Sequence, residues 1–233
     1  MAIYVMSDIH GEYDKYCEML DKIGLSDDDT LYVLGDVVDR GPRPIDVLRD
    51  MMKRPNVYPL LGNHDLLALD VLKKLNVEIT EDNYANHLDT DTMSELIDWL
   101  RDGGSTTLSQ FRELSKDEKS DVLDYIEDFA LCEAVDIGSK TFLLVHAGLG
   151  NFRRGKKLRE YTLRELIMDR HDPDNDYFED DDIFVITGHT PTVIYTGKDE
   201  IYHYKHNIFI DCGACMGGRL ACLCLDTMEE FYV

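Results

Sequence analysis

The stretch Gly35-Asp36-Val37-Val38-Asp39-Arg40-Gly41 places two carboxylates and an arginine between two glycines, directly after an apolar run at residues 31–34. The run predicts a buried strand, and a helical pattern begins near Pro44. Open α/β sheets usually carry their chemistry on loops that leave the carboxyl ends of strands. Charged side chains there are costly to bury without partners, so the stretch predicts a site for metal cations and an anionic substrate.

The order of strand, polar motif and helix occurs three times in the first part of the chain. We expect strands at residues 2–6, 31–34 and 57–61, and helices at 12–23, 45–52 and 66–75. Asp8 and His10 alternate along the chain, so both side chains can converge beyond the first strand. A lone Asp-x-His is more often a surface turn, but Asn63 and His64 follow the third strand in the same way. Three such clusters indicate one shared site.

The rest of the chain predicts an α/β protein of one domain, residues 1–233, with a helical insertion at about 76–130 beside the site. Its helices are expected at residues 92–101, 105–114 and 116–129. Trp99 is interpreted as a buried anchor of this part rather than a ligand contact. Beyond it we expect a hairpin of strands at 135–138 and 141–145, a helix at 162–170, a strand at 183–187 and two or three more strands.

The amino-acid composition of the chain limits the kinds of partner that it can bind. The net charge of −23 argues against a general nucleic-acid-binding surface. No stretch approaches the ~20 apolar residues of a membrane span, and no basic segment precedes a hydrophobic one, so we expect no membrane partner and a cytoplasmic location. Residues 153–159 are an exception, rich in arginine and lysine, and predict an exposed loop or, alternatively, a contact with an anionic substrate or partner.

Six cysteines leave two interpretations open. They lie at positions 17, 132, 212, 215, 222 and 224. Cys222 and Cys224 would face the same side of a strand, and free cysteine behaves as a small hydrophobe, so buried thiols are the first interpretation. A zinc site or a redox pair is the alternative.

Six residues at strand ends form a mixed set of oxygen and nitrogen donors: Asp8, His10, Asp36, Asn63, His146 and His189. This set suits manganese, iron or zinc and lacks the thiolates of a structural zinc site. Six side chains exceed what one ion needs if it also keeps waters. Two metals ~3.5–4 Å apart that share a carboxylate fit better, and such a pair clamps a phosphoryl group.

The motifs resemble those of the phosphoprotein phosphatase family, within the calcineurin-like metallophosphoesterase superfamily. The matching pieces, in order, are Asp8-x-His10-Gly11, Gly35-Asp36-x-Val38-Asp39-Arg40-Gly41, Gly62-Asn63-His64-Asp65, His146-Ala147-Gly148 and Gly188-His189-Thr190. The Asp-Arg-Gly extension and the Gly-His-Thr-Pro ending distinguish this family from other metallophosphoesterases, which usually end in Gly-His-x-His, and the chain looks most like the small bacterial and phage-type members. The resemblance covers about half of the chain, and Ser7 and Asp65 depart from the usual glycine and glutamate.

The resemblance implies a fold and a set of roles. The expected fold is two mixed β-sheets packed as a sandwich, flanked by helices. Asp8, His10 and Asp36 would hold the first metal, and Asp36 would bridge to a second metal held by Asn63, His146 and His189. His64 would be the general acid and Asp39 would keep it protonated, while Arg40 would bind phosphate together with a second arginine, for which Arg170 is the candidate.

The leading hypothesis is a manganese-dependent phosphatase, with iron or zinc as other metals. It would remove phosphate from serine or threonine, and also tyrosine, of proteins, or from small phosphate esters. Attack by metal-bound hydroxide would be in line, without a phosphoenzyme. The alternative is a hydrolase of dinucleoside polyphosphates of the symmetrical diadenosine tetraphosphatase type. A third hypothesis, a module without catalysis, would predict a missing ligand or a missing His64, and none is missing.

Overall fold

The computed structural model describes residues 1–233 except 78–88, 175–176 and 179–181. Two mixed five-stranded sheets form its centre, in the orders β10-β9-β1-β2-β3 and β4-β5-β6-β8-β7. The first sheet contains β1 (Ile3–Met6), β2 (Thr30–Val33), β3 (Val57–Pro59), β9 (Ala221–Cys224) and β10 (Glu230–Tyr232). The second contains β4 (Cys132–Ile137), β5 (Lys140–Val145), β6 (Ile183–Thr187), β7 (Tyr202–Tyr204) and β8 (Asn207–Phe209). This confirms the predicted architecture of two mixed sheets.

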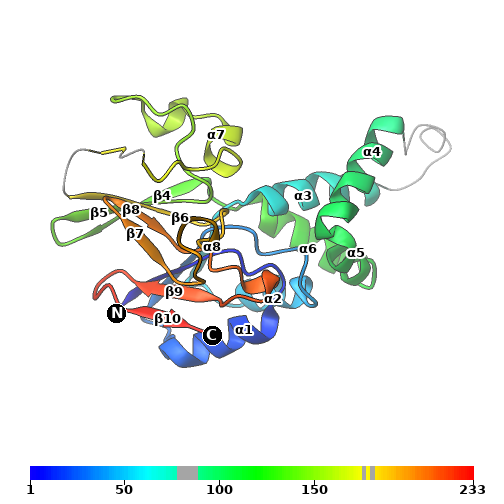
Figure 1. Ribbon diagram of the computed structural model, residues 1–233. Coiled ribbons are helices and arrows are strands. Elements are labelled where there is room, and N and C mark those ends of the chain that lie inside the picture. The colour runs from blue at the N-terminus through cyan, green and yellow to red at the C-terminus, as the bar shows by residue number, and fades with distance from the viewer. Residues whose placement is uncertain (78–88, 175–176, 179–181) are drawn as a thin grey trace.

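The sheets pack against each other through an apolar layer, and helices cover their outer faces (Figure 1). The helices and short turns are α1 (Tyr13–Ile23), α2 (Pro44–Met51), α3 (Asn63–Leu75), α4 (Thr90–Trp99), η1 (Leu100–Gly104), α5 (Ser105–Arg112), α6 (Lys116–Glu127), η2 (Leu158–Glu160), α7 (Leu163–Ile167), α8 (Val193–Thr196) and η3 (Ala214–Met216). In β1, Val5 faces the layer between the sheets and Met6 faces α1 and α2. The alternation follows from the two-residue period of a strand.

Parallel pairing brings the carboxyl ends of the central strands to one edge. β1 pairs in parallel with β2, and β2 with β3, while β9 and β10 run antiparallel on the other side. In the second sheet β5, β6 and β8 are parallel, and β4 and β7 form antiparallel edges. The loops after β1, β2, β5 and β6 therefore leave the sheets in the same region, as a site built from them requires.

Several elements differ from the sequence-based predictions, and three of the differences have a clear cause. The third helix begins at Asn63, because Asp65 accepts a hydrogen bond from the Gly62 N–H at 3.0 Å and completes a capping box. The helix expected at 162–170 ends at Ile167, because the carbonyls of Glu165 and Leu166 accept hydrogen bonds from the loop at residues 147–150. Four strands follow β6 instead of two or three, because β7 and β10 are three residues long, too short to show alternation.

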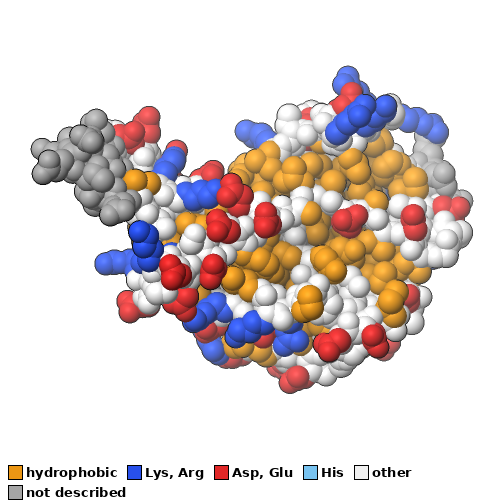
Figure 2. All heavy atoms as spheres, turned by 180° about the vertical axis from the view of Figure 1, so that it is seen from behind, with side chains coloured by type: hydrophobic (Ala, Val, Ile, Leu, Met, Phe, Trp, Pro, Cys, Tyr) orange, Lys and Arg blue, Asp and Glu red, His pale blue; other side chains and the backbone are white. Residues whose placement is uncertain are grey.

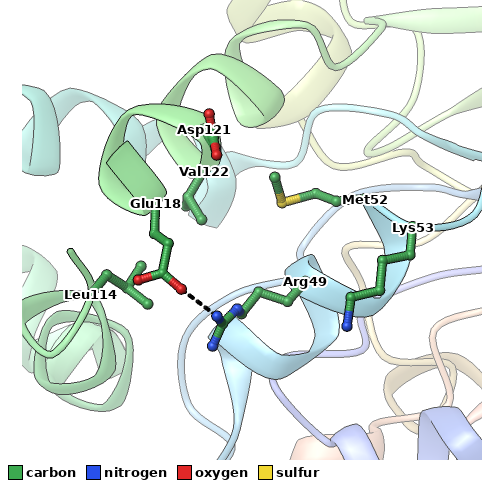
Figure 3. A pocket seen from close by; sticks show the side chains of 7 residues that line it. All are labelled: Arg49, Met52, Lys53, Leu114, Glu118, Asp121 and Val122. Atoms are coloured by element: carbon green, nitrogen blue, oxygen red, sulfur yellow. Dashed lines mark hydrogen bonds and ion pairs between the residues drawn. The ribbon is translucent and has the colours of Figure 1, made fainter. Parts of the chain in front are cut away.

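The predicted insertion is a helical segment of α4, η1, α5 and α6, to which we refer as the helical segment (residues 89–128). Part of the predicted range, residues 78–88, lies outside the described residues. Arg49 on α2 pairs with Glu118 on α6 across a pocket lined also by Met52, Leu114 and Val122 (Figure 3). Lys73 and Lys74 on α3 also pair with glutamates of the segment. Several acidic side chains of the segment therefore attach it to α2 and α3 and do not only face solvent. Within the described residues, no helix combines the length and the apolar character that crossing a membrane requires.

The loops after β1 and β2 approach each other so closely that Gly41 has no room for a side chain. The His10 N–H donates to the Asp36 carbonyl at 2.8 Å, and the Gly41 N–H donates to the His10 carbonyl at 2.8 Å. A Cβ at Gly41 would lie 2.1 Å from the His10 carbonyl oxygen. The glycine therefore allows two backbones to meet at the base of the site.

We expect Gly41→Ala to lower the free energy of unfolding by about 1–3 kcal/mol, as overpacking does. The added methyl group should also displace the His10 backbone, and this displacement should abolish the phosphoesterase activity that the sequence predicts. The matched control is Gly138→Ala in the β4–β5 hairpin, where φ is +63° and no atom lies within 4 Å of the added Cβ. It should cost about 1–2 kcal/mol through left-handed strain alone and keep activity. Thermal unfolding and initial rates measure both effects, and an active Gly41→Ala protein would refute the packing argument.

Candidate active site

The predicted donors lie where strands end. Asp8 and His10 follow β1, Asp36 follows β2, Asn63 and His64 form the first turn of α3, His146 follows β5, and His189 follows β6. Asp8, His10, Asp36, His64 and His146 are each at most 3% exposed. The two sheets thus bring all seven side chains to one junction, where Asn63 and His189 are half-buried and the other five are buried.

Backbone conformation sets these residues apart. Nine non-glycine residues of the described chain have a positive φ, and six of them belong to the predicted site: Asp8, His10, Asp36, Asp39, Arg40 and His189. Left-handed conformations of this kind are uncommon and cluster at functional sites. Fixed loop hydrogen bonds hold them here, such as Asp8 N–H to the Gly35 carbonyl at 3.1 Å.

Asp36 lies at the centre of the donors. Its Oδ2 is 3.5 Å from His10 Nε2, and its Oδ1 is 3.5 Å from His146 Nε2. Two groups of donor atoms, each within 4.8 Å of one another, share this carboxylate: His10, Asp36 and His64, and Asp36, His146 and His189. The carboxylate is placed as a residue shared between two cations would be. Asp8 is in neither group, because its Oδ2 contacts the Ser7 hydroxyl and the His189 N–H.

Backbone carbonyls hold two of the histidine rings so that their Nε2 atoms point into the site. His146 Nδ1 is 2.6 Å from the Leu34 carbonyl and must donate to it, so in the neutral ring Nε2 carries a lone pair. That Nε2 lies 3.0 Å from Asn63 Oδ1, and His189 Nδ1 lies 2.8 Å from the same oxygen. His10 repeats the pattern, with Nδ1 2.9 Å from the Val38 carbonyl. Metal-binding histidines are typically held in this way, so the donor set fits divalent cations.

The Arg40 guanidinium already places positive charge against these donors. Its Nη1 is 2.9 Å from His10 Nε2, and its Nη2 is 2.7 Å from His64 Nε2. An arginine only donates, so both ring nitrogens accept from it. His10 is a predicted metal ligand, so one ring nitrogen that would bind a metal ion faces a positive charge in this structure. The sequence predicted phosphate binding for Arg40, and in the structure its side chain lies over the histidines.

Burial shifts the pKa values of the carboxylates and imidazoles of the site. It raises the pKa of Asp8 and of Asp36 to about 6, and it lowers the pKa of His189 to about 3 and that of His10 well below its usual value. Neutral imidazoles are the form that binds metals. Burial also opposes protonation of His64, but the hydrogen bond to Asp39 and the charge of Asp36 outweigh it and raise that pKa.

An open pocket of about 450 Å³ lies over this junction. Its walls include His10, His189 and two arginines, Arg40 and Arg170. Arg170 was the sequence-based candidate for a second phosphate contact, and the structure brings it to the same pocket. Pro191, Ile194 and Met216 add an apolar rim, on which Ile194 is 60% and Met216 is 68% exposed. The pocket can thus hold an anionic group at its base and an apolar group at its mouth.

His64 is held by a buried carboxylate. Its Nδ1 lies 2.9 Å from Asp39 Oδ2, and both side chains are at most 1% exposed. The Nδ1 donates to Asp39, which leaves Nε2 facing Arg40, a residue that lines the pocket. This is the arrangement predicted for a general acid, although its distances also place His64 among the donors of one metal-type group.

Sequence reasoning missed the full contribution of Asp65. It was noted only as a departure at the third motif, but its carboxylate is fully buried and accepts hydrogen bonds from the backbone N–H groups of Asp36, Val37 and Gly62 at 2.7, 2.9 and 3.0 Å. It ties the second motif to the start of α3. Its spacing as the third residue after Gly62 is the capping-box signal that would have found it.

Asp102 of the helical segment also reaches the site. Its carboxylate lies 3.5 Å from Arg40 Nη2 and 3.6 Å from His64 Nε2, and its side chain is 55% exposed. It therefore contacts the two groups that a phosphoryl oxygen would contact.

We expect Asp102→Asn to bind inorganic phosphate about two- to fivefold more tightly, because an exposed ion pair of up to ~1 kcal/mol no longer competes for Arg40. Phosphate inhibition constants measure this. The control is Asp98→Asn, since Asp98 is an exposed acid of the same segment that pairs with Arg101. Equal or weaker phosphate binding by Asp102→Asn would contradict competition.

The basic residues at 153–159 add no side chain to the pocket lining in the described chain. Figure 2 shows lysine and arginine side chains gathered at the end of the molecule away from the helical segment, where Figure 1 places the approach to α7. Lys156 is an exception to the predicted exposure, because its Nζ pairs with Glu165 at 2.9 Å and lies 3.8 Å from the Tyr161 ring centroid. The first interpretation, an exposed loop, holds for the other four, which are exposed.

The sequence and fold comparisons agree with this geometry. The family model described as calcineurin-like phosphoesterase matches residues 1–212. A symmetrical bis(5'-nucleosyl)-tetraphosphatase of Delftia acidovorans is 40% identical over 103 residues, which are 43% of this chain and 37% of that protein. The chain thus matches little more than a third of that relative's length.

Two solved structures share the fold. A crystal structure of a protein provisionally named a diadenosine tetraphosphatase superposes with a TM-score of 0.68 at 18% identity, over 99% of this chain and 92% of that one. A protein serine/threonine phosphatase of Saccharomyces cerevisiae gives 0.57 at 16% identity, over 97% and 72%. The chain belongs to the calcineurin-like phosphoesterase family. In the described residues, the clusters of histidine and aspartate are consistent with the two-metal site typical of that superfamily.

Proposed function

We propose that this chain hydrolyses dinucleoside polyphosphates, with two divalent cations, manganese first among them, held by the predicted donors. The first would be held by Asp8, His10 and Asp36, and the second by Asp36, Asn63, His146 and His189. The central position of Asp36 between two donor groups carries this part of the proposal. When bound, such a pair supplies Lewis-acid activation of water and of the phosphoryl group.

The surrounding side chains complete the reaction. Arg40 and Arg170 bind phosphoryl oxygens at the base of the pocket, since both line it. To do so, Arg40 moves from His64 Nε2, which then faces the leaving oxygen. Once Arg40 has moved, Nε2 takes up a proton from water, and the resulting imidazolium passes that proton to the leaving oxygen while Asp39 holds the ring through Nδ1. The buried dyad thus gives the leaving group the proton it needs.

The choice of substrate rests on the sequence relatives. The symmetrical tetraphosphatases are near 40% identical over 103 residues, whereas the protein phosphatase of known structure shares the fold at 16% identity. The apolar rim of Ile194 and Met216 also suits a nucleobase, because stacked and apolar contacts are the usual way to hold one. Symmetrical cleavage of a tetraphosphate would yield two nucleoside diphosphates.

A phosphomonoesterase acting on proteins is the second candidate, and it was the leading hypothesis from the sequence. One observation favours it. In the described chain the pocket is lined by two cationic side chains, with Asp102 beside them, which is little positive charge for a tetraphosphate and enough for a single phosphate.

A direct comparison of substrates tests the proposal. Manganese-loaded protein is given diadenosine tetraphosphate in one reaction and phosphoserine, phosphothreonine and phosphotyrosine peptides in others. We expect the higher kcat/KM for the dinucleotide, with ADP as the only product. Preference for the peptides would establish the second candidate instead. The Ile194→Ser variant separates the two further, because loss of the rim should raise KM for the dinucleotide more than for a small phosphate ester.

A further inference from the structure

The carboxylate of Asp39 receives more than the His64 contact. Trp99 Nε1 donates to its Oδ2 at 2.8 Å, and the Thr107 hydroxyl donates to its Oδ1 at 2.7 Å. The Thr107 oxygen also accepts the Asp39 N–H at 3.0 Å. Asp39, Trp99 and Thr107 are all fully buried. Trp99 is therefore a buried anchor, as its type suggested, and it also belongs to the hydrogen-bond network of the site.

The two donors come from the helical segment, about 60 residues further along the chain, and its backbone is shaped for the contact. The turn at Gly103 has a φ of +112° and its carbonyl accepts the Arg40 N–H at 2.9 Å. A Cβ at Gly103 would lie 2.6 Å from Arg40 Cγ, and one at Gly104 would lie 2.3 Å from the Trp99 ring. The segment thus closes directly over Asp39 and Arg40.

The geometry points to Trp99 and Thr107 as positioning residues for His64. Together with His64 they give the Asp39 carboxylate three donors, two at Oδ2 and one at Oδ1, so the carboxylate cannot turn away from the ring. A carboxylate that is fixed in this way fixes the orientation of the His64 ring. The helical segment thereby takes part in proton donation without contacting substrate. This inference rests on the proposed function through the role of His64 as general acid.

Rates with two substrates that differ in their leaving group show whether Trp99 and Thr107 position His64 or only stabilise the folded protein. Trp99→Phe keeps an aromatic ring and removes the donor, and Thr107→Val removes the hydroxyl at nearly constant shape. Each should lower kcat for phenyl phosphate, a poor leaving group, by ~10–100-fold, as loss of a supporting residue does. Each should change kcat for 2,4-dinitrophenyl phosphate less than about threefold, because that leaving group needs little help from an acid. Thr107→Ser retains the hydroxyl, so the ratio of its rates with the two substrates should match that of the wild type.

Phe111→Leu is the control for folding, since Phe111 is buried on the same helix as Thr107 and makes no hydrogen bond to Asp39. It should change both rates by the same factor. A second readout uses metal-free protein with ¹⁵N-labelled histidine. The proton on His64 Nδ1, identified by its loss in His64→Asn, should give a sharp signal in the wild type and exchange broadening in both variants.

Each outcome has one meaning. A loss of rate with phenyl phosphate alone, together with a broadened His64 signal, supports the role of Trp99 and Thr107 as positioning residues. Equal loss for both substrates, or unchanged rates with an unchanged signal, overturns it. A wild type that hydrolyses neither ester would refute the proposed function, while the nuclear magnetic resonance comparison would still test the contact with Asp39.

Discussion

Replacement of His64 by asparagine is expected to slow hydrolysis of substrates with poor leaving groups by about 10²–10⁴-fold, the usual contribution of a general acid. The ring is held through Nδ1 by Asp39, and its Nε2 faces Arg40, which lines the pocket. Asparagine has no acidic proton to give to the leaving group. Initial rates with phenyl phosphate and with diadenosine tetraphosphate measure the effect.

The metal content of the His64→Asn variant decides whether His64 is a general acid or a metal ligand. The ring lies within 4.8 Å of the donor atoms of His10 and Asp36, so distance alone would also allow it to be a ligand. A general acid predicts that His64→Asn keeps its metal ions, as measured by plasma mass spectrometry, whereas a ligand predicts their loss. His203→Asn is the matched control, because His203 pairs with Glu230 at the surface. Unchanged turnover in His64→Asn would remove the residue from the mechanism.

Asp36→Asn is expected to weaken both metal ions together. Each carboxylate oxygen faces a different histidine, so the amide removes the charge that both donor groups share. The loss of affinity should exceed the ~10–100-fold typical of a supporting residue. Calorimetric titration with manganese should show two sites in the wild type, and none at the same concentrations in the variant.

Thermal unfolding gives an independent test of the same substitution. Free manganese at about 100 times its dissociation constant should stabilise the wild type by ~2.7 kcal/mol for each site, and should leave Asp36→Asn unchanged. Asp8→Asn serves as the comparison, because it should weaken the first metal and spare the second. Full occupancy of both sites in Asp36→Asn would rule out a shared carboxylate.

Local sequence signals were enough to predict the donors and the first layer of the fold. Strand, motif and helix alternate over short distances, and each donor follows its strand within a few residues, so Asp8, Asp36 and Asn63 could be placed without any long-range information. The parallel order β1-β2-β3 follows from the same repeat, because α1 and α2 are the crossovers.

The contacts of the helical segment with the site could not be predicted, because they join residues far apart in the chain. Trp99 and Thr107 lie 60 and 68 positions from Asp39. A tryptophan in an amphipathic pattern indicates burial, and nothing local indicates which acceptor its N–H meets. The adjacent glycines Gly103 and Gly104, inside a helical pattern, were the available signal, since such a pair marks a close backbone approach.

The left-handed residues of the site have a consequence for any simplification of these loops. Six of them at about 1 kcal/mol each amount to conformational energy on the order of 6 kcal/mol. The net stability of a domain, about 5–15 kcal/mol, already includes such strain, so the hydrogen bonds and buried contacts around the loops offset it. Glycine at one of these positions would relieve backbone strain and would at the same time remove the donor that the strained loop holds in place.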